Sequence, residues 1–310
     1  MHRRSMNGLP MDWRVKALAF RVLEHLPMQQ SAYSFLQRYV TRSYPRALSP
    51  TQESSASQRD HVRAFREWLG PLEDAGLFEF GAGWDLYGNL VFWTLGINRQ
   101  TVMDLSRWVR PAYVNAAIQH LQREPAEGAV RAPRTLLPER GFEQVLERSY
   151  GIRYVAPGDA RATGLPAGSI DLMATTSTLE HIPVEDLRAI LRESRRLCGE
   201  HAVVSHTVDY SDHFAHSDPR INPYNFLRFS SEQWAPFNSS FHHQNRLRHR
   251  DYRRLFEEAG FEVAEERAVH DPDAAQQLAS VPLAEDFRHY RPEEILPRVG
   301  RFVLRPAPSP

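Results

Sequence analysis

A short apolar run in this sequence ends at two glycines, with acidic side chains on either side of them. The run is Leu77–Phe80, the glycines are Gly81 and Gly83, and the acids are Glu79 and Asp85. Read as a buried strand followed by a tight turn, the stretch lets a ligand approach the backbone, because glycine adopts positive φ and carries no Cβ. Ligands of open α/β sheets bind beyond the carboxyl ends of the strands. The stretch therefore predicts a ligand-binding turn.

Two further acids follow the next predicted strands. Asp104 ends the second strand, where its carboxylate can accept hydrogen bonds from both hydroxyls of a ribose. Asp159 stands shortly past the third strand, where it can accept from the amino group of an adenine. A single acid at a strand end is a weak indication, because aspartate there commonly caps a helix. Together with Glu79, the acids are in register with three successive strands, and this pattern favours a nucleoside ligand.

The turn does not match the pattern expected for a dinucleotide. That pattern is G-x-G-x-x-G, and Leu86 stands here in place of its third glycine. Carboxylates at Glu79 and Asp85 would also repel a pyrophosphate, whereas they suit an amino group or a sulfonium ion. An NAD-dependent oxidoreductase is therefore the weaker alternative.

Strands and helices must alternate along the chain if these acids are to meet at one edge of a sheet. Apolar runs and helical periodicity predict such an alternation, which indicates an α/β fold with a mostly parallel sheet. A stretch rich in Ser, Pro and Gln, 43–60, is predicted to be a linker. The predicted strands cover residues 77–80, 101–104, 153–156, 169–175, 202–206, 261–268 and 301–304. The predicted helices cover residues 61–70, 87–95, 184–198 and 251–259, with further helical stretches at 114–121 and 142–147.

The overall composition limits the classes of function. Lysine plus arginine and aspartate plus glutamate both number 38, so the chain lacks the basic excess that nucleic-acid binders carry. The single cysteine, Cys198, excludes an internal disulfide and favours a reducing compartment. No apolar run approaches the roughly 20 residues that span a bilayer. We therefore predict a cytoplasmic protein that does not bind nucleic acid.

The N-terminal region predicts an amphipathic helix at residues 11–26. The simplest interpretation is a helix that packs on the rest of the protein. A basic amphipathic helix can instead lie on a membrane surface, and contact of residues 11–26 with a membrane is the alternative. The apolar positions at helical spacing are Met11, Val15, Leu18, Val22 and Leu26.

Four motifs, in order, resemble those of the class I S-adenosylmethionine-dependent methyltransferases. Leu77–Gly83 resembles the first motif, Val102–Asp104 the second and Gly158–Ala160 the third. Residues 168–172, continuing to 177–182, resemble the fourth motif and the turn after it. The resemblance implies a Rossmann-like methyltransferase fold with a seven-stranded, mostly parallel sheet and helices on both faces. It also implies an N-terminal helical extension, a long lid insertion after the fifth strand, and S-adenosylmethionine as the cofactor.

The same resemblance implies roles for individual residues. Glu79, Gly81 and Gly83 would surround the methionine part of the cofactor, and Asp104 would hold the ribose. Leu105, Asp159 and Ala160 would lie at the adenine. Thr176 and Ser177 would lie near the methyl group. His181 follows the fourth strand, where family members often have a residue of this type, and a contact at a helix N-terminus is its alternative role. The chain between Asp104 and Asp159 is longer than the family pattern, which implies an inserted helix.

Residues 207–249 form a long polar segment, rich in aromatic and histidine residues, after the fifth predicted strand. Loops after strand ends hold the substrate in this architecture, and an ordered connection of this length usually has a function. We predict that the segment covers the methyl group and binds the acceptor. His213 and Asp212 are the predicted catalytic pair, because either can take a hydroxyl proton near neutral pH. Asp209 and His206 are the next candidates.

No metal site is predicted from the sequence. His206, Asp209, His213 and His216 offer imidazole and carboxylate ligands, but they lack a fixed spacing, and hydrogen bonding is the commoner use of such residues. Three arginines of the segment could bind a phosphate or carboxylate on the acceptor, or pair with nearby acids. They are Arg228, Arg246 and Arg248.

These patterns predict a methyltransferase that acts on a small-molecule or sugar-like acceptor, by O-methylation. Features of residues 11–42 and 207–249 resemble bacterial methyltransferases of surface-glycan or secondary-metabolite pathways. Besides the oxidoreductase, a non-catalytic partner protein that keeps the cofactor fold is an alternative. The predicted organisation is a helical extension and linker (1–60), a methyltransferase domain (61–305) and a tail (306–310).

Overall fold

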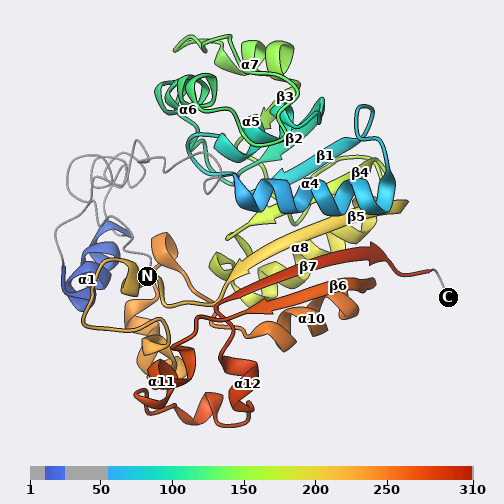
Figure 1. Ribbon diagram of the computed structural model, residues 1–310. Coiled ribbons are helices and arrows are strands. Elements are labelled where there is room, and N and C mark those ends of the chain that lie inside the picture. Colours follow the sequence, from blue (N-terminus) through green and yellow to red (C-terminus); the bar gives the residue numbers. More distant parts are fainter. Residues whose placement is uncertain (1–10, 25–54, 309–310) are drawn as a thin grey trace.

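The computed structural model of the protein is built around a seven-stranded sheet (Figure 1). It describes residues 11–24 and 55–308. The strand order is β3-β2-β1-β4-β5-β7-β6, and neighbours pair in parallel except that β7 runs antiparallel to β5 and β6. The chain winds outward from β1 in one direction and from β4 in the other. The carboxyl ends of these two strands therefore border the crevice in which such sheets bind ligands.

The order of the elements matches the sequence prediction, while several of their ends differ. The strands are β1 (Gly76–Phe80), β2 (Arg99–Met103), β3 (Ile152–Val155), β4 (Ile170–Thr176), β5 (Cys198–Asp209), β6 (Phe261–Val269) and β7 (Val299–Pro306). The helices are α1 (Trp13–Glu24), α4 (Ala56–Leu69), α5 (Tyr87–Thr94), α6 (Pro111–Arg123), α7 (Phe142–Tyr150), α8 (Val184–Leu197), α9 (Ser231–Trp234), α10 (His249–Glu258), α11 (Ala274–Ala279) and α12 (Pro292–Ile295). Two short 3₁₀ helices matter for the site, η2 (Leu179–His181) and η3 (His213–His216).

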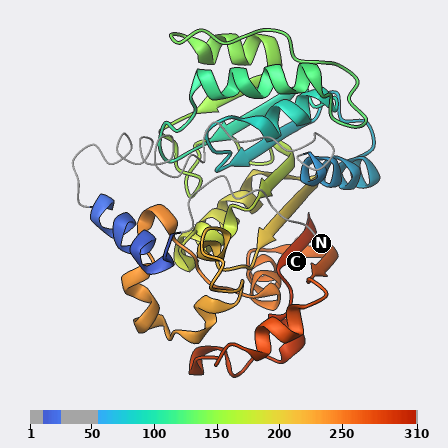
Figure 2. The same cartoon turned by 60° about the vertical axis from the view of Figure 1, so that its left-hand side comes forward.

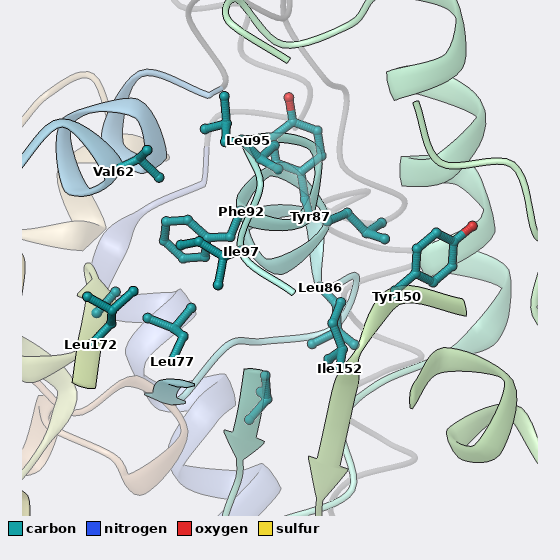
Figure 3. Packing of buried hydrophobic residues seen from close by; sticks show 14 of the residues in the cluster. Val62, Leu77, Leu86, Tyr87, Phe92, Leu95, Ile97, Tyr150, Ile152 and Leu172 are labelled. Carbon is teal, nitrogen blue, oxygen red and sulfur yellow. The ribbon is translucent and has the colours of Figure 1, made fainter. Parts of the chain in front are cut away.

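Helices cover both faces of the sheet, and each face has its own apolar core. On one face α4 to α7 pack over the strands, with Leu77, Phe92 and Ile152 among the buried side chains (Figure 3). On the other face α8 and α10 contribute Leu187 and Phe256. Each large side chain of this kind stabilises the fold by about 1.5–3 kcal/mol when it is buried. Burial on both faces explains why the central strands read as nearly continuous apolar runs.

A third apolar core joins three segments that are far apart in the sequence. Helix α1 packs beside the segment that follows β5, and the stretch around α11 and α12 completes the cluster (Figure 2). The ring centroid of Trp13 lies 5.7 Å from that of Phe214 and 6.1 Å from that of Trp234. Residues 270–298, for which the sequence predicted no element, thus help to fix the position of the 207–249 segment.

The side of α1 that faces this core is not the predicted one. Its buried side chains are Trp13, Ala17 and Phe20, whereas Val15, Leu18 and Val22 are exposed. The two aromatic rings offer more area to bury than the aliphatic stripe does, and they decide which side packs inward. Position 26 of the predicted helix lies outside the described residues. Within the described ranges, no helix combines the length and the apolar character needed to cross a membrane.

Two predicted boundaries were wrong. Helix α4 begins at Ala56, so the predicted linker is helical over 56–60, and its residues 43–54 lie outside the described residues. Strand β5 continues to Asp209, because it pairs with β4 on one side and with β7 on the other as far as the pair Asp209 and Val299. The predicted insertion therefore starts inside β5, and its last residue is the first of α10. The inserted helix between the second and third strands is confirmed by α6 and α7.

The seven-stranded, mostly parallel sheet with helices on both faces confirms the predicted fold class. The additions at the N-terminus and after β5 are also present, and they meet each other in the third core.

Candidate functional site

The turn after β1 has the backbone geometry that its glycines predicted. Gly81 has φ 73° and Gly83 has φ 82°. The N–H of Gly81 donates to the carbonyl oxygen of Met103 at 3.0 Å, which ties the end of β1 to the end of β2. A Cβ on Gly81 would lie only 2.5 Å from Cγ2 of Thr178. Glycine is therefore required at position 81 both by its backbone angles and by the close approach of the loop after β4.

A cavity of about 140 Å³ opens at this turn. Beside it, a Cβ built on Gly83 would meet no atom within 4 Å. Part of the wall comes from the start of α4, and this part could not be recognised from the sequence, because the stretch has the composition of a linker. The lining residues are Ser57, Gln58, Glu79, Gly81, Ala82, Asp85, Tyr87, Gly88, Asn89 and Thr176.

Glu79 points its carboxyl group into a buried polar environment. Its Oε2 accepts a hydrogen bond of 2.7 Å from Nδ2 of Asn89. The same Nδ2 also donates to Oε1 of Gln100 at 3.3 Å. Burial raises the pKa of Glu79 to about 8, and the nearby charge of Asp104 acts in the same direction. A carboxyl group in this state would gain its charge if a cationic group entered the cavity.

Asp104 lies directly after β2 and is 4% exposed. Its Oδ2 is buried and has no hydrogen-bond partner in the described structure. Burial raises the pKa of Asp104 to about 7, and hydrogen bonds from the hydroxyl of Tyr154 and from the N–H groups of Ala82 and Gly81 offset this only in part. A buried acceptor without a donor is unusual in a protein interior and suggests that a ligand completes the site.

The loop after β3 lies against the end of β2, because the N–H of Gly158 donates to the carbonyl oxygen of Asp104 at 2.8 Å. Leu105 is 69% exposed and leaves an apolar surface open next to Asp104. Both carboxylate oxygens of Asp159 are engaged by the guanidinium of Arg161, at 2.8–3.1 Å. Ala160 packs against the second core. The structure thus brings the loop of Asp159 to the site but turns its carboxylate toward Arg161.

Thr176 and Ser177 lie at the carboxyl end of β4. Thr176 lines the cavity, and its Oγ1 lies 3.1 Å from Nε2 of His61 on α4. The other ring nitrogen of His61 lies 2.7 Å from Oγ of Ser205, and burial lowers the pKa of this histidine to about 4. Ser177 has φ 50° and donates its N–H to the carbonyl oxygen of Thr207 at 2.8 Å. A neutral imidazole that sequence reasoning did not single out therefore holds one wall of the cavity.

The two members of the predicted catalytic pair have different partners in the fold. Asp212 is fully buried and caps η3, and it accepts hydrogen bonds from the N–H of Phe214 and from Nδ2 of Asn225. Burial raises its pKa to about 6, although these hydrogen bonds act in the opposite direction. The carboxylate that faces His213 is instead Asp209, whose Oδ2 lies 3.6 Å from Nε2 of the imidazole. Burial alone would raise the pKa of Asp209, but His213 and two donors from Ser211 hold it well below its usual range.

Two residues of η2 adjoin this pair. The N–H of Asp209 donates to Oε1 of Glu180 at 3.3 Å, and burial raises the pKa of Glu180 well above its usual value. The rings of His181 and His213 meet edge to face, with centroids 4.8 Å apart, and burial lowers the pKa of His181 to about 4. We call Glu180, His181, Asp209 and His213 the edge cluster. Sequence reasoning had weighed His181 only as a single residue and had missed Glu180.

The remaining candidates of the acceptor segment are used inside the fold. His206 is 1% exposed, lies 2.7 Å from Oγ1 of Thr175 and stacks on Phe256. Arg248 is fully buried and donates to the carbonyl oxygens of Tyr210, Ile295 and Pro297. Arg246 donates to the carbonyl oxygens of Phe226 and Phe229. Of the three arginines, only Arg228 is exposed. Of the two alternatives considered for Arg246 and Arg248, an anion on the acceptor or a nearby acid, neither describes these contacts, since both guanidinium groups donate mainly to carbonyl oxygens of the chain.

A family model described as "Methyltransferase domain" matches residues 34–266, well over half of the chain. The match includes the turn after β1, the ends of β2 to β5 and the acceptor segment. Among curated proteins, none matches the sequence.

Two solved structures that resemble this chain are a cyclase and a methyltransferase. The [4+2]-cyclase SpnF is 13% identical, with a TM-score of 0.51, and the alignment covers 97% of this chain and 100% of the cyclase. A Burkholderia thailandensis 1,6-didemethyltoxoflavin-N1-methyltransferase, solved with that substrate and S-adenosylhomocysteine, is 12% identical, with a TM-score of 0.48, and the alignment covers 94% of this chain and 91% of that one. At these identities the likeness to the cyclase concerns the fold alone, and a fold of this kind carries several chemistries.

Proposed function

The chain belongs to the methyltransferase domain family, and from that premise we propose that it methylates a hydroxyl oxygen of a small-molecule or sugar-like acceptor. It is an S-adenosylmethionine-dependent methyltransferase with the Rossmann-like fold of its family. The nature of the acceptor, the O-methylation and the roles of single residues are the proposal.

The residues at the turn after β1 fit the cofactor. The buried Oδ2 of Asp104 has no donor, and a ribose hydroxyl would supply one. The space beside Gly83 would be lost to any side chain. The carboxyl groups of Glu79 and Asp104 suit the amino group and the ribose hydroxyls of S-adenosylmethionine, and they would disfavour a ligand rich in phosphate. We assign the methionine part to the cavity next to Gly81, the ribose to Asp104 and the adenine to the open surface at Leu105.

The observation that carries the proposal is the junction between this cavity and the edge cluster. Oγ1 of Thr178 lies 3.5 Å from the carbonyl oxygen of Gly81, and the N–H of His181 donates to the carbonyl oxygen of Thr178 at 3.0 Å. Only a short loop thus separates the cofactor turn from Glu180 and His181. The acceptor segment, held in place by the third core, brings His213 to the same point.

The edge cluster is equipped to receive a hydroxyl group. Bound S-adenosylmethionine would supply a sulfonium-activated methyl group. The acceptor oxygen would take this methyl as the S–C bond breaks to leave a thioether, and the hydroxyl proton would be released. The imidazole of His213 and the carboxylate of Asp209 would orient the hydroxyl and help it lose that proton. The acceptor segment would exclude water and hold the reacting atoms in line.

Asp159 has a more limited role in this proposal than the sequence implied. Its carboxylate could meet the adenine amino group only by exchanging part of its pairing with Arg161, which is itself paired with Asp186. We keep Asp159 and Ala160 as residues of the loop beside the adenine. Likewise, we keep Thr176 and Ser177 beside the transferred methyl, and we transfer the role proposed for Asp212 to Asp209.

The biological setting is also part of the proposal. The resemblance of the acceptor segment to methyltransferases of bacterial glycan and secondary-metabolite pathways supports an acceptor of that class. The lone cysteine, Cys198, is buried and unpaired, which supports a cytoplasmic location.

The experiment that tests this proposal uses S-adenosylmethionine labelled with ¹³C at its methyl group. The protein is incubated with a metabolite extract from its source organism, and methyl-selective NMR of the products distinguishes a carbon bound to oxygen from one bound to nitrogen or carbon. We expect a labelled O-methyl product. A labelled methyl on nitrogen or carbon would refute the choice of acceptor atom. As a matched control, a Gly81→Val variant should give no product.

A further inference from the structure

Four side chains of the edge cluster meet where β4 and β5 end, beside the cofactor cavity rather than within it. Glu180 and His181 lie on η2, Asp209 is the last residue of β5, and His213 begins η3. One nitrogen or oxygen ligand atom from each of Glu180, His181 and His213 lies within 4.8 Å of the other two. Metal sites in proteins are built from such sets of two imidazoles and one carboxylate.

Within residues 11–24 and 55–308, the atoms of this cluster that face one another have few hydrogen-bond partners. Glu180 is 3% exposed, its Oε2 is buried without a hydrogen bond in the described part of the chain, and its Oε1 accepts the N–H of Asp209 at 3.3 Å. Among the described residues, no basic side chain forms an ion pair with Glu180. Nε2 of His213 is also buried without a hydrogen bond and lies 3.6 Å from Oδ2 of Asp209. Two carboxyl groups and an imidazole thus share a small volume that holds too few donors for their lone pairs.

The second imidazole is held in the orientation of a metal ligand. Nδ1 of His181 lies 2.8 Å from the carbonyl oxygen of His243, so this nitrogen carries the proton and donates it. The lone pair is then left on Nε2. Histidines that ligate metals almost always donate their other ring N–H to a carbonyl or carboxylate in this way. The support is itself anchored, because the ring of His243 lies 3.2 Å from Nδ2 of Asn238.

His216 also lies beside the edge cluster, since its ring stacks on that of His213 with centroids 5.0 Å apart. Two other histidines of the segment make aromatic contacts with the cores. His242 lies between aromatic rings, with centroids 4.5 Å from Phe214 and 5.1 Å from Phe20. His206 faces Phe256 in the second core. The set considered from the sequence, which included His206 and His216, therefore differs from the group that the fold assembles among the described residues.

We propose that Glu180, His181 and His213 bind one divalent cation of the kind that imidazole and carboxylate ligands favour, such as Mn²⁺, Fe²⁺, Co²⁺ or Zn²⁺. Asp209 stands next to it as a further acidic group. Three protein ligands leave coordination positions open, as in catalytic metal sites. This inference rests on the proposed function and deepens it: an open position would take the acceptor hydroxyl.

A cation at this place would supply the activation that the reaction needs. A hydroxyl bound to a divalent cation ionises at a much lower pH than a free one. The acceptor O–H bond breaks and its proton passes to water. The oxygen then forms the new O–C bond while the S–C bond of the cofactor breaks, so one methyl and one positive charge leave the sulfonium, and the released proton balances that charge. With the cation bound, Nε2 of His213 would be a ligand on the acceptor side, so its contribution to the loss of the hydroxyl proton would be made through the cation and not by taking up the proton itself.

The test measures binding of Mn²⁺ and Zn²⁺ to the full-length protein, without cofactor, by titration calorimetry and by metal analysis after dialysis. We expect one equivalent in the wild type and a loss of affinity of more than about tenfold in Glu180→Gln and in His213→Ala. His201→Ala is the matched control, because His201 is exposed on β5 and outside the edge cluster. It should bind metal like the wild type. Absence of binding in the wild type, or equal binding in all variants, would overturn the inference.

Two further readouts keep the result interpretable. The affinity for S-adenosylmethionine should be unchanged in Glu180→Gln. This result would show that the variant is folded and that its loss of metal binding has a local cause. Bound Co²⁺ should give a visible absorption spectrum that changes in His213→Ala. If chelated protein transfers methyl to oxygen at an undiminished rate, the cation inference fails and the O-methylation stands. If metal binds as described and the labelled methyl appears on nitrogen or carbon, the proposed acceptor fails and the metal site stands.

Discussion

Replacing Asp104 with asparagine should have opposite effects on the stability of the free protein and on its affinity for S-adenosylmethionine. The carboxyl group of Asp104 is 4% exposed, and burial raises its pKa from the usual 3.8 to about 7. A native pKa above the unfolded value means that the folded protein binds more protons between these two values. Stability therefore falls as the pH rises from about 4 to about 7. The full rise corresponds to at most about 4 kcal/mol.

Asparagine is nearly the same size but has no charge to bury, so the variant should lose most of this dependence on pH. Thermal unfolding of the cofactor-free protein should show an unchanged or higher Tm for Asp104→Asn at pH 8, and a smaller fall between pH 5 and pH 8 than in the wild type.

Cofactor affinity should change in the other direction. The unpartnered Oδ2 is the atom assigned to a ribose hydroxyl, and charge-assisted hydrogen bonds contribute about 1.5–3 kcal/mol. Titration calorimetry should therefore show a dissociation constant about 10- to 100-fold larger in Asp104→Asn and in Asp104→Ala than in the wild type. If Asp104 served only to hold Tyr154 and the turn after β1, both variants would lose stability and keep their affinity. That result would refute the assignment.

The remaining predictions concern the turn, the pH, the acceptor side and the support of the lid. Gly81→Val should abolish cofactor binding in a folded protein, because the new Cβ would meet Thr178 at 2.5 Å and the residue would be strained at φ 73°; calorimetry that found wild-type affinity would place the ligand elsewhere. Cofactor affinity in the wild type should rise by up to about tenfold from pH 6 to pH 7, as the proton that Asp104 must lose becomes easier to remove, and Asp104→Asn should flatten this profile. His213→Ala should lower turnover by about 10²- to 10⁴-fold while cofactor affinity stays within about twofold, which a turnover assay and calorimetry on the same sample would check. Arg248→Met should lower the free energy of unfolding in urea by several kcal/mol, since three buried carbonyl oxygens would lose their donor at about 1–3 kcal/mol each; a change below about 1 kcal/mol would show that water replaces the guanidinium.

The sequence predicted the framework of the fold well because the sheet is buried on both faces. Strands such as β1 and β4 read as apolar runs that glycine and polar turns interrupt, and no tertiary information is needed to find them. The turn of Gly81 and Gly83 was predictable for the same local reason. Glycine adopts positive φ readily because it has no Cβ, so these angles follow from the residue type.

The lid and its supports were harder to predict, because tertiary packing decides them. The packed side of α1 depends on Phe214 and Trp234, which lie two hundred residues further along the chain. The length of β5 depends on its second partner, β7, which is also distant in sequence. Helix α4 lies partly in a stretch of Ser, Gln and Arg that looks like a linker until its buried face, including His61 and Phe65, meets the sheet.

The candidate site divides in the same way. Residues fixed by a motif, such as Asp104, could be named from the sequence, whereas partners brought by the fold could not. Asp212 is the direct neighbour of His213 in the sequence and Asp209 lies four residues before it, yet Asp209 faces the imidazole. The end of β5 and the cap of η3 decide this arrangement. Glu180 gave no signal by itself, because its importance comes from its burial beside Asp209.

The central claim is that cofactor and acceptor meet where β1, β4 and β5 end. A crystal structure of the complex with S-adenosylhomocysteine tests it most directly. The account predicts ribose hydroxyls within hydrogen-bond distance of Oδ2 of Asp104, the amino end in the cavity beside Gly81, and the sulfur directed toward Glu180, His181 and His213. A sulfur atom directed away from these three residues, or a ribose that does not contact Asp104, would contradict it.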